Sequence, residues 1–174
     1  MYAAYDATRG VVKTTYVIRS ELSLTHFDSA FLDMVCGHED TDVLPGAPGD
    51  VIAHAATTIN VELPPSHCEL LAHFNGGAIG SIRLFGVGRD DSLDLVSSLQ
   101  AYSDIPAVAA LNMLPFASDW GGSLYCFDLA NPIADGEFSV WYWCHEYSEE
   151  PADAPYAWRN TQDGFADFIR NLFS

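Results

Sequence analysis

Residues 138–145 constrain the fold most, because the strand that they predict is apolar on both faces. One face carries Phe138, Val140, Tyr142 and Cys144, and the other carries Trp141 and Trp143. Side chains alternate between the two faces of a strand, and a strand without a polar face needs cover on both sides. We therefore expect this strand to lie inside a sheet and not at its edge.

The rest of the chain predicts a mixture of strands and helices. After Pro106, residues 111–117 and 123–129 form β-rich runs around the Gly121-Gly122 turn, which with residues 138–145 predicts an antiparallel meander. Strands are also predicted at residues 11–19 and 82–87. Helical spacing of apolar side chains predicts helices at residues 25–37, 50–63, 66–74 and 92–102 and after Thr161. This order indicates an α+β fold.

Local signals predict where several of these elements begin and end. Thr25 with Asp28, and Ser66 with Glu69, have the spacing of a capping box at a helix start. Asn75-Gly76-Gly77 is expected to close the helix that begins at Ser66. Residues 37–49 are acidic and contain two Pro-Gly pairs, which predicts a loop. We expect residues 1–49 to form an N-terminal extension, packed on or linked to a domain at residues 50–174.

The charge of the chain excludes some classes of partner. Its 24 acidic residues exceed its 7 basic residues by 17, and Lys13 is its single lysine. Binding to nucleic acid depends on clustered Lys and Arg, so a nucleic-acid ligand is not expected, and anionic membranes are disfavoured for the same reason. Two interpretations remain open: an acidic surface that only keeps the protein dispersed, and an acidic surface that binds a cationic partner.

Length and composition indicate one globular domain. At 174 residues with 49% hydrophobic side chains, the chain can bury a core without metal or disulfide support. The first residues lack a basic segment followed by an apolar one, and no apolar run is long enough to cross a membrane. We expect a cytoplasmic protein in which Cys36, Cys68, Cys126 and Cys144 remain thiols.

No pattern in the sequence predicts a metal or a cofactor. Cys36-x-His38, His67-Cys68 and Cys144-His145-Glu146 do not match known ligand spacings. Neighbouring ligands such as Cys144 and His145 point to opposite faces of a strand, so one metal does not readily take both. The glycines at residues 75–80 follow a predicted helix, which is the wrong context for a nucleotide loop.

Cys68 is the best candidate for a nucleophile. A place in the first turn of a helix would lower the pKa of its thiol through the helix dipole. His67, His73 and His145 are possible bases, but no signature of a cysteine hydrolase surrounds Cys68. We interpret Cys68 as a partly buried structural thiol.

Several motifs resemble the SUKH superfamily of Smi/Knr-type domains. They are, in order, Leu63-Pro64-Pro65-Ser66, Phe74-Asn75-Gly76-Gly77, Leu84-Phe85-Gly86, Leu114-Pro115-Phe116-Ala117-Ser118-Asp119-Trp120-Gly121-Gly122 and Tyr125-Cys126-Phe127-Asp128-Leu129. The aromatic strand at residues 140–146 and the last helix also agree, so the similarity covers residues 50–174. His67 departs from the pattern, because relatives often carry an aromatic residue there, and the lead-in at residues 1–49 is longer than usual.

The resemblance implies an α+β fold with a mixed, largely antiparallel sheet surrounded by helices. It also implies a non-catalytic protein without a cofactor, because the family contains bacterial immunity proteins that neutralise toxins and a fungal regulator of cell-wall synthesis. Three functions remain open at this point: an immunity protein bound to a cationic toxin domain such as a nuclease, an adaptor or regulator of envelope synthesis, and a small hydrolase that uses Cys68 or His145 with a metal. Oligomeric state is left open.

For a protein partner, we expect contacts from acidic loops and from one exposed aromatic residue. Trp120 stands in a predicted turn, where an aromatic side chain makes a good interface anchor. The candidate contact residues are Asp90, Asp91, Asp94, Asp119, Trp120, Glu149, Glu150 and Asp153.

Overall fold

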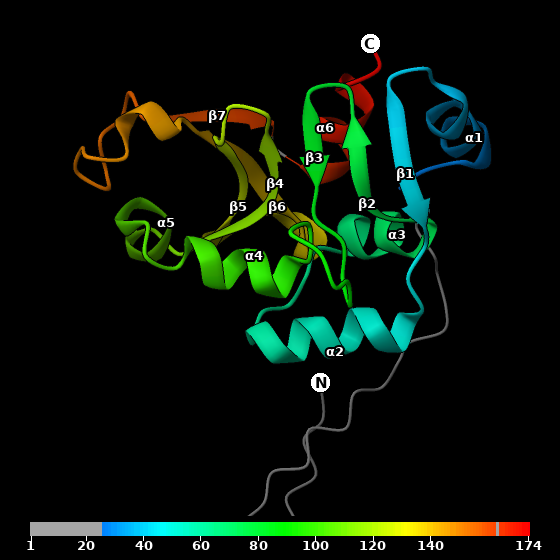
Figure 1. Cartoon of the computed structure of the whole chain (residues 1–174), viewed down its shortest axis with the longest axis horizontal. Helices are drawn as coiled ribbons and strands as arrows, with labels where there is room; N and C mark the ends of the chain where they lie inside the picture. Colours follow the sequence, from blue (N-terminus) through cyan, green and yellow to red (C-terminus); the bar gives the residue numbers. More distant parts are fainter. Residues whose placement is uncertain (1–25, 163) are drawn as a thin grey trace, which may run out of the picture.

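A computed structural model describes residues 26–162 and 164–174 (Figure 1). It contains one seven-stranded sheet with the order β1-β2-β3-β4-β5-β6-β7, so every strand pairs with its neighbours in the sequence. All six strand pairs are antiparallel. The predicted α+β class is confirmed, and the predicted strand at residues 11–19 lies outside the described residues.

The helices and strands alternate along the first half of the chain and then give way to a run of strands. The helices are α1 (Ser29–Gly37), α2 (Gly49–Ile59), α3 (Pro65–His73), α4 (Leu95–Tyr102), α5 (Pro106–Ala110) and α6 (Phe165–Asn171). The strands are β1 (Thr41–Pro45), β2 (Phe74–Ile79), β3 (Ile82–Leu84), β4 (Met113–Asp119), β5 (Leu124–Pro132), β6 (Phe138–Trp143) and β7 (Trp158–Gln162). Two short 3₁₀ turns lie at Ala134–Gly136 and His145–Tyr147.

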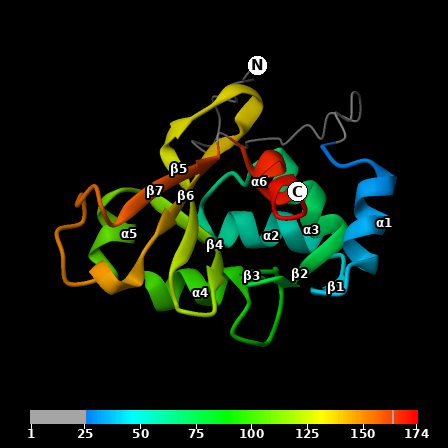
Figure 2. The same ribbon diagram turned by 90° about the horizontal axis from the view of Figure 1, so that it is seen from above.

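The sheet separates two hydrophobic clusters. The larger one joins side chains of α1, α2, α3, α4 and α6 to the strands, and in Figure 1 α3 and α6 lie behind β2 and β3. The smaller one covers the opposite face of β5 and β6 with side chains of α5 and of residues 152–158. Figure 2 shows the same arrangement from above, with the helices distributed around the sheet.

Strand β6 has the position that its sequence predicts. It pairs with β5 on one side and with β7 on the other. Val140 is buried in the larger cluster, whereas Trp143 is buried in the smaller one. The strand is therefore internal and covered on both faces, as its two apolar faces require.

Neither helix begins with its predicted cap residue, and Thr25 itself lies outside the described residues. Asp28 itself caps α1, and its Oδ1 accepts a hydrogen bond of 2.8 Å from the backbone N–H of Phe31. Pro65 starts α3, so Ser66 lies inside the first turn of that helix and is not its cap. Proline suits this position because its missing N–H would have no helical partner there.

A glutamate from elsewhere in the chain binds the backbone N–H of Ser66 that Glu69 was predicted to bind. Glu137 accepts 2.8 Å and 2.6 Å hydrogen bonds from the backbone N–H and the hydroxyl of Ser66. Glu69 instead binds the backbone N–H groups of His26 and Phe27, at 2.7 Å and 3.1 Å. The capping-box prediction was wrong for Ser66 because long-range carboxylates outcompete the local pair.

Two segments predicted as loops or helix ends are strands. Residues 41–45 lie in the predicted loop but form β1. Asp42 and Leu44 face solvent, whereas Thr41 and Val43 face the protein. An edge strand tolerates this polar side and the terminal Pro45. Asn75-Gly76-Gly77 lies within β2 instead of closing a helix. Both glycines have positive φ there and allow close approach to neighbouring strands.

Two further elements were not predicted. Residues 106–110 form the short helix α5, which starts at Pro106 and buries Ala107 and Val108, so the change to strands comes later than Pro106. Residues 158–162 form β7, and the last helix begins at Phe165, after Thr161 as predicted. Pairing with β6 fixes this polar segment in the sheet, an interaction that its local sequence does not reveal.

Candidate functional site

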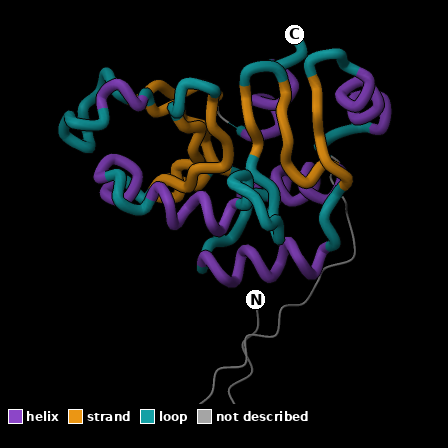
Figure 3. The backbone as a smooth tube through the Cα atoms, viewed as in Figure 1, coloured by secondary structure: helices purple, strands orange, loops and turns teal. Residues whose placement is uncertain are grey.

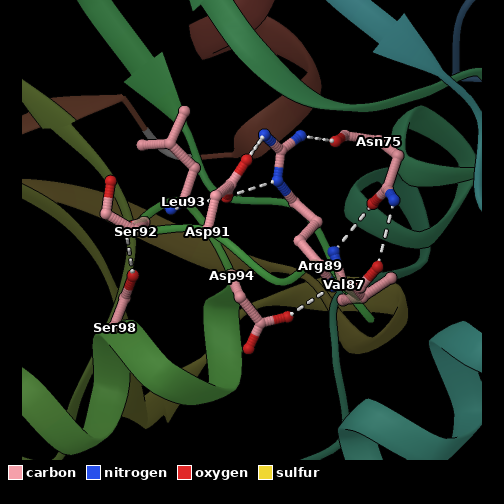
Figure 4. A network of polar contacts seen from close by, with 8 residues as sticks. All are labelled: Asn75, Val87, Arg89, Asp91, Ser92, Leu93, Asp94 and Ser98. Atoms are coloured by element: carbon pink, nitrogen blue, oxygen red, sulfur yellow. Dashed lines mark hydrogen bonds and ion pairs between the residues drawn. The ribbon is translucent and has the colours of Figure 1, made fainter.

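The segment between β3 and α4 carries three of the predicted contact residues and is held by Arg89 (Figure 4). The guanidinium of Arg89 forms a two-pronged ion pair with Asp91 and donates a 2.7 Å hydrogen bond to the carbonyl of Asn75. The Arg89 hydrogen bond lowers the pKa of the Asp91 carboxyl below its usual value. The side chain of Asp91 therefore has an internal partner, although it is exposed.

Asp94 caps α4 from a buried position. Its Oδ2 accepts a 3.0 Å hydrogen bond from the backbone N–H of Ser97, and its Oδ1 accepts one of the same length from the backbone N–H of Arg89. Only 5% of Asp94 is accessible to solvent. Asp90 directly precedes Asp91, and its side chain is exposed.

Asp119 and Trp120 form the turn between β4 and β5. The carboxylate of Asp119 accepts 2.9 Å and 3.0 Å hydrogen bonds from the backbone N–H of Ser123 and the hydroxyl of Tyr142. These bonds fix the turn. Trp120 is 67% exposed, and the guanidinium of Arg83 lies 5.0 Å from the centre of its ring. The tryptophan is therefore presented to solvent on a cation–π contact, as its place in the turn predicts.

Residues 144–157, hereafter the β6–β7 segment, carry Glu149, Glu150 and Asp153. All three side chains are exposed. Figure 3 shows the segment as a long connection with a short helical turn, extending beyond the strands. Tyr156 donates a 2.8 Å hydrogen bond to Glu150, and this bond raises the pKa of the tyrosine hydroxyl.

The structure brings two of the three groups of predicted residues to the same end of the sheet. They are Asp119 with Trp120, and the acidic residues of the β6–β7 segment. The backbone N–H of His145 donates a 3.3 Å hydrogen bond to the hydroxyl of Ser123, which joins the β6–β7 segment to the turn that contains Trp120. The group in the segment between β3 and α4 lies elsewhere. Ile82 pairs with Asp119 and Leu84 with Ala117, so the turn lies at the start of β3, whereas Asp90 follows its end.

Two exposed tyrosines of this end were missed from the sequence. Tyr147 and Tyr156 are 37% and 57% exposed, and their rings meet edge to face at 5.1 Å between centroids. Both lie within the acidic run at residues 146–156. The sequence signal that could have found them is an aromatic side chain in a segment too polar to form part of the core.

Cys68 and His67, two of the residues considered for hydrolase chemistry, have environments that oppose it. Burial raises the pKa of the Cys68 thiol to about 11, with a further contribution from Glu137, so the predicted lowering by the helix dipole is wrong. Burial lowers the pKa of His67 to about 3, and its ring lies among Phe116, Phe127 and Phe165. Across residues 26–162 and 164–174, no group of three or more His, Cys, Asp or Glu side chains could hold a metal ion.

No helix among the described residues combines the length and the apolar character that crossing a bilayer requires.

Within residues 26–162 and 164–174, the ion pairs between a carboxylate and an arginine are those of Asp91 and Asp167. The remaining exposed carboxylates, including those of the β6–β7 segment, have no arginine within 4.0 Å in the described part of the chain.

Comparison with known proteins identifies the family. A search of curated proteins gave no match. Residues 46–171 match the SMI1 / KNR4 family (SUKH-1), which covers β2 to β7 and the helices α2 to α6. The match includes the turn with Trp120 and the β6–β7 segment. With this match over most of its length and an α+β fold, the chain belongs to the SMI1 / KNR4 family (SUKH-1).

Proposed function

We propose that this protein is a non-catalytic immunity protein, which acts in the cytoplasm and neutralises a basic toxin enzyme, such as a nuclease, by binding it through an acidic surface. Family membership supports the coarser statement, because SUKH proteins are generally immunity proteins or Smi/Knr-type regulators. The observation that carries the proposal is the excess of 17 negative charges, with most exposed carboxylates of the described residues free of an arginine partner.

The physics of association supports this function. An enzyme that acts on an anionic substrate has a basic active site, and clustered carboxylates can occupy the positions of phosphate groups. Charge complementarity raises the association rate, while an aromatic side chain buried at the interface slows dissociation. The exposed carboxylates that can attract a basic partner are those of Asp90, Glu149, Glu150 and Asp153. The exposed aromatic side chain that can be buried at the interface is that of Trp120.

The test is binding to a toxin domain encoded beside the gene for this protein. A catalytically inactive form of that domain should co-purify with the protein, and the dissociation constant should rise about tenfold or more between 50 mM and 500 mM NaCl. Inhibition of the active toxin at a one-to-one ratio would support neutralisation. Binding that does not depend on salt would contradict the role of the acidic surface.

A regulator of envelope synthesis is the alternative within the same family. A gene placed among envelope-synthesis genes, with no toxin gene nearby, would support that function and count against immunity. A purified protein that converts a substrate would contradict both, because each proposal involves binding alone.

A further inference from the structure

Three exposed aromatic side chains lie at one end of the sheet. Six large hydrophobic side chains are exposed among the described residues, and they are Met34, Leu44, Trp120, Ile133, Tyr147 and Tyr156. The three aromatic ones belong to the turn between β4 and β5 and to the β6–β7 segment, which are joined by the bond between His145 and Ser123. Exposed tyrosine and tryptophan are typical of the residues that dominate binding energy at protein interfaces.

The β6–β7 segment is fixed in place although it extends into solvent. Its two ends meet, because the backbone N–H of Cys144 donates a 3.0 Å hydrogen bond to the carbonyl of Ala157. The indole N–H of Trp158 donates another of 3.0 Å to the carbonyl of Ala152. Ala154 and Ala157 are buried in the smaller cluster. A segment that is already ordered loses little conformational entropy when it binds.

The same segment has a strongly negative surface. Glu146, Glu149, Glu150 and Asp153 are all exposed. No lysine or arginine occurs in residues 90–158, so nothing within the segment compensates these charges. A second copy of this chain would present the same charge and be repelled, whereas a basic protein surface would be attracted.

We propose that the β6–β7 segment, together with Trp120, is the docking surface for the basic face of a protein partner. Tyr147 and Tyr156 are the anchors that the partner covers, and the surrounding carboxylates attract it. Asp90 and Asp91 lie beyond the other end of β3, outside this surface. This inference rests on the proposed function; it places the interface at Trp120 and the acidic residues of the β6–β7 segment and leaves out the group between β3 and α4.

The experiment measures binding kinetics with the inactive toxin domain encoded beside this gene. Replacing both anchors (Tyr147→Ala with Tyr156→Ala) should weaken affinity about 30-fold, mainly through faster dissociation. Reversing charge (Glu149→Lys, Glu150→Lys and Asp153→Lys) should slow association about tenfold at low salt. Tyr156→Phe retains the ring and should keep affinity within about threefold, which separates contact by the ring from the bond to Glu150.

Matched controls lie at the opposite edge of the sheet, in and after α1. Met34→Ala removes an exposed apolar side chain there, and Asp33→Lys with Glu39→Lys reverses exposed charges. Both should bind like the unaltered protein, and circular dichroism should show that every variant is folded. A complex that forms normally with both β6–β7 variants would overturn the docking surface but leave the immunity function standing. Failure of the unaltered protein to bind would overturn both.

Discussion

His67 is the residue whose environment most clearly affects stability. Its ring is enclosed by phenylalanines, and its Nδ1 has no hydrogen-bond partner among the described residues. Burial lowers its pKa to about 3, while an unfolded chain takes up the proton near the ordinary value of 6.5. The unfolded state therefore binds more protons between these two values. The contribution of His67 to stability is complete above pH 6.5 and is lost as the pH falls towards 3.

We predict that His67→Phe removes this part of the pH dependence. The loss between pH 6.5 and pH 3 amounts to about 4 kcal/mol for such a shift. The free energy of unfolding of the variant, measured by urea denaturation across this range, should decline less than that of the unaltered protein. The control is His54→Gln on the exposed side of α2, which should leave the slope unchanged. Equal slopes for all three proteins would show that His67 is not the responsible group.

Gly77 is a residue where the backbone leaves no room for a side chain. Its φ is +126°, and an added Cβ would lie 2.2 Å from the carbonyl oxygen of Asp42 on strand β1. We predict that Gly77→Ala lowers the free energy of unfolding by about 3 kcal/mol, from strain and from separation of β1 and β2. Gly37→Ala is the control, because its Cβ would meet nothing within 4 Å. Thermal and urea denaturation should show a loss for Gly77→Ala alone.

At the scale of the element, α3 depends on a carboxylate from another part of the chain. Pro64 precedes the helix and offers no side-chain cap, while Glu137 binds the backbone N–H and hydroxyl of Ser66 in its first turn. A negative charge at this end also interacts favourably with the helix dipole. Glu137 thus ties the connection between β5 and β6 to the start of α3.

We predict that Glu137→Gln lowers the free energy of unfolding by about 1 to 2 kcal/mol, because the amide keeps the shape but loses the charge-assisted bonds. Urea denaturation at neutral pH is the measurement. Glu39→Gln, at an exposed position after α1, should change stability by less than about 0.5 kcal/mol. A loss of the same size in both variants would indicate an effect of net charge in place of the cap.

The sequence predicted elements whose pattern is set locally. The helix at residues 92–102 appears as α4, and the strands at residues 111–117, 123–129 and 138–145 appear as β4, β5 and β6. β1 and β7 were missed because each is defined by pairing with a neighbour. Gly76 and Gly77 were misread because positive φ can end a helix or shape a strand, and the sequence does not distinguish the two.

The candidate site was predictable only in part. Its acidic character and the exposure of Trp120 followed from composition and from the turn. Asp94 was grouped with Asp90 by sequence proximity, yet it is buried as a cap, because the role of a carboxylate depends on which backbone N–H groups surround it. Tyr147 and Tyr156 were missed because tyrosine is as common in cores as on surfaces.

At the scale of the whole molecule, the excess of 17 negative charges opposes compaction. We predict that raising NaCl from 20 mM to 300 mM increases the melting temperature by several degrees, because the salt screens repulsion between exposed carboxylates. Differential scanning fluorimetry at pH 7.5 is the measurement. A variant with Asp33→Asn, Glu39→Gln and Asp40→Asn carries less charge and should gain less from salt. An equal gain would point to a cause other than repulsion.

The order of the sheet has a consequence for how the protein matures during synthesis. Because each strand pairs with the one made just before it, the sheet can grow in step with translation, and most of it can form before the final residues emerge. The bonds that hold the β6–β7 segment come from Ala157 and Trp158, at the junction with the last strand. A growing chain would therefore pair β1 to β6 before the proposed docking surface is fixed, and a chain that ends before Ala157 would lack the bonds that fix it.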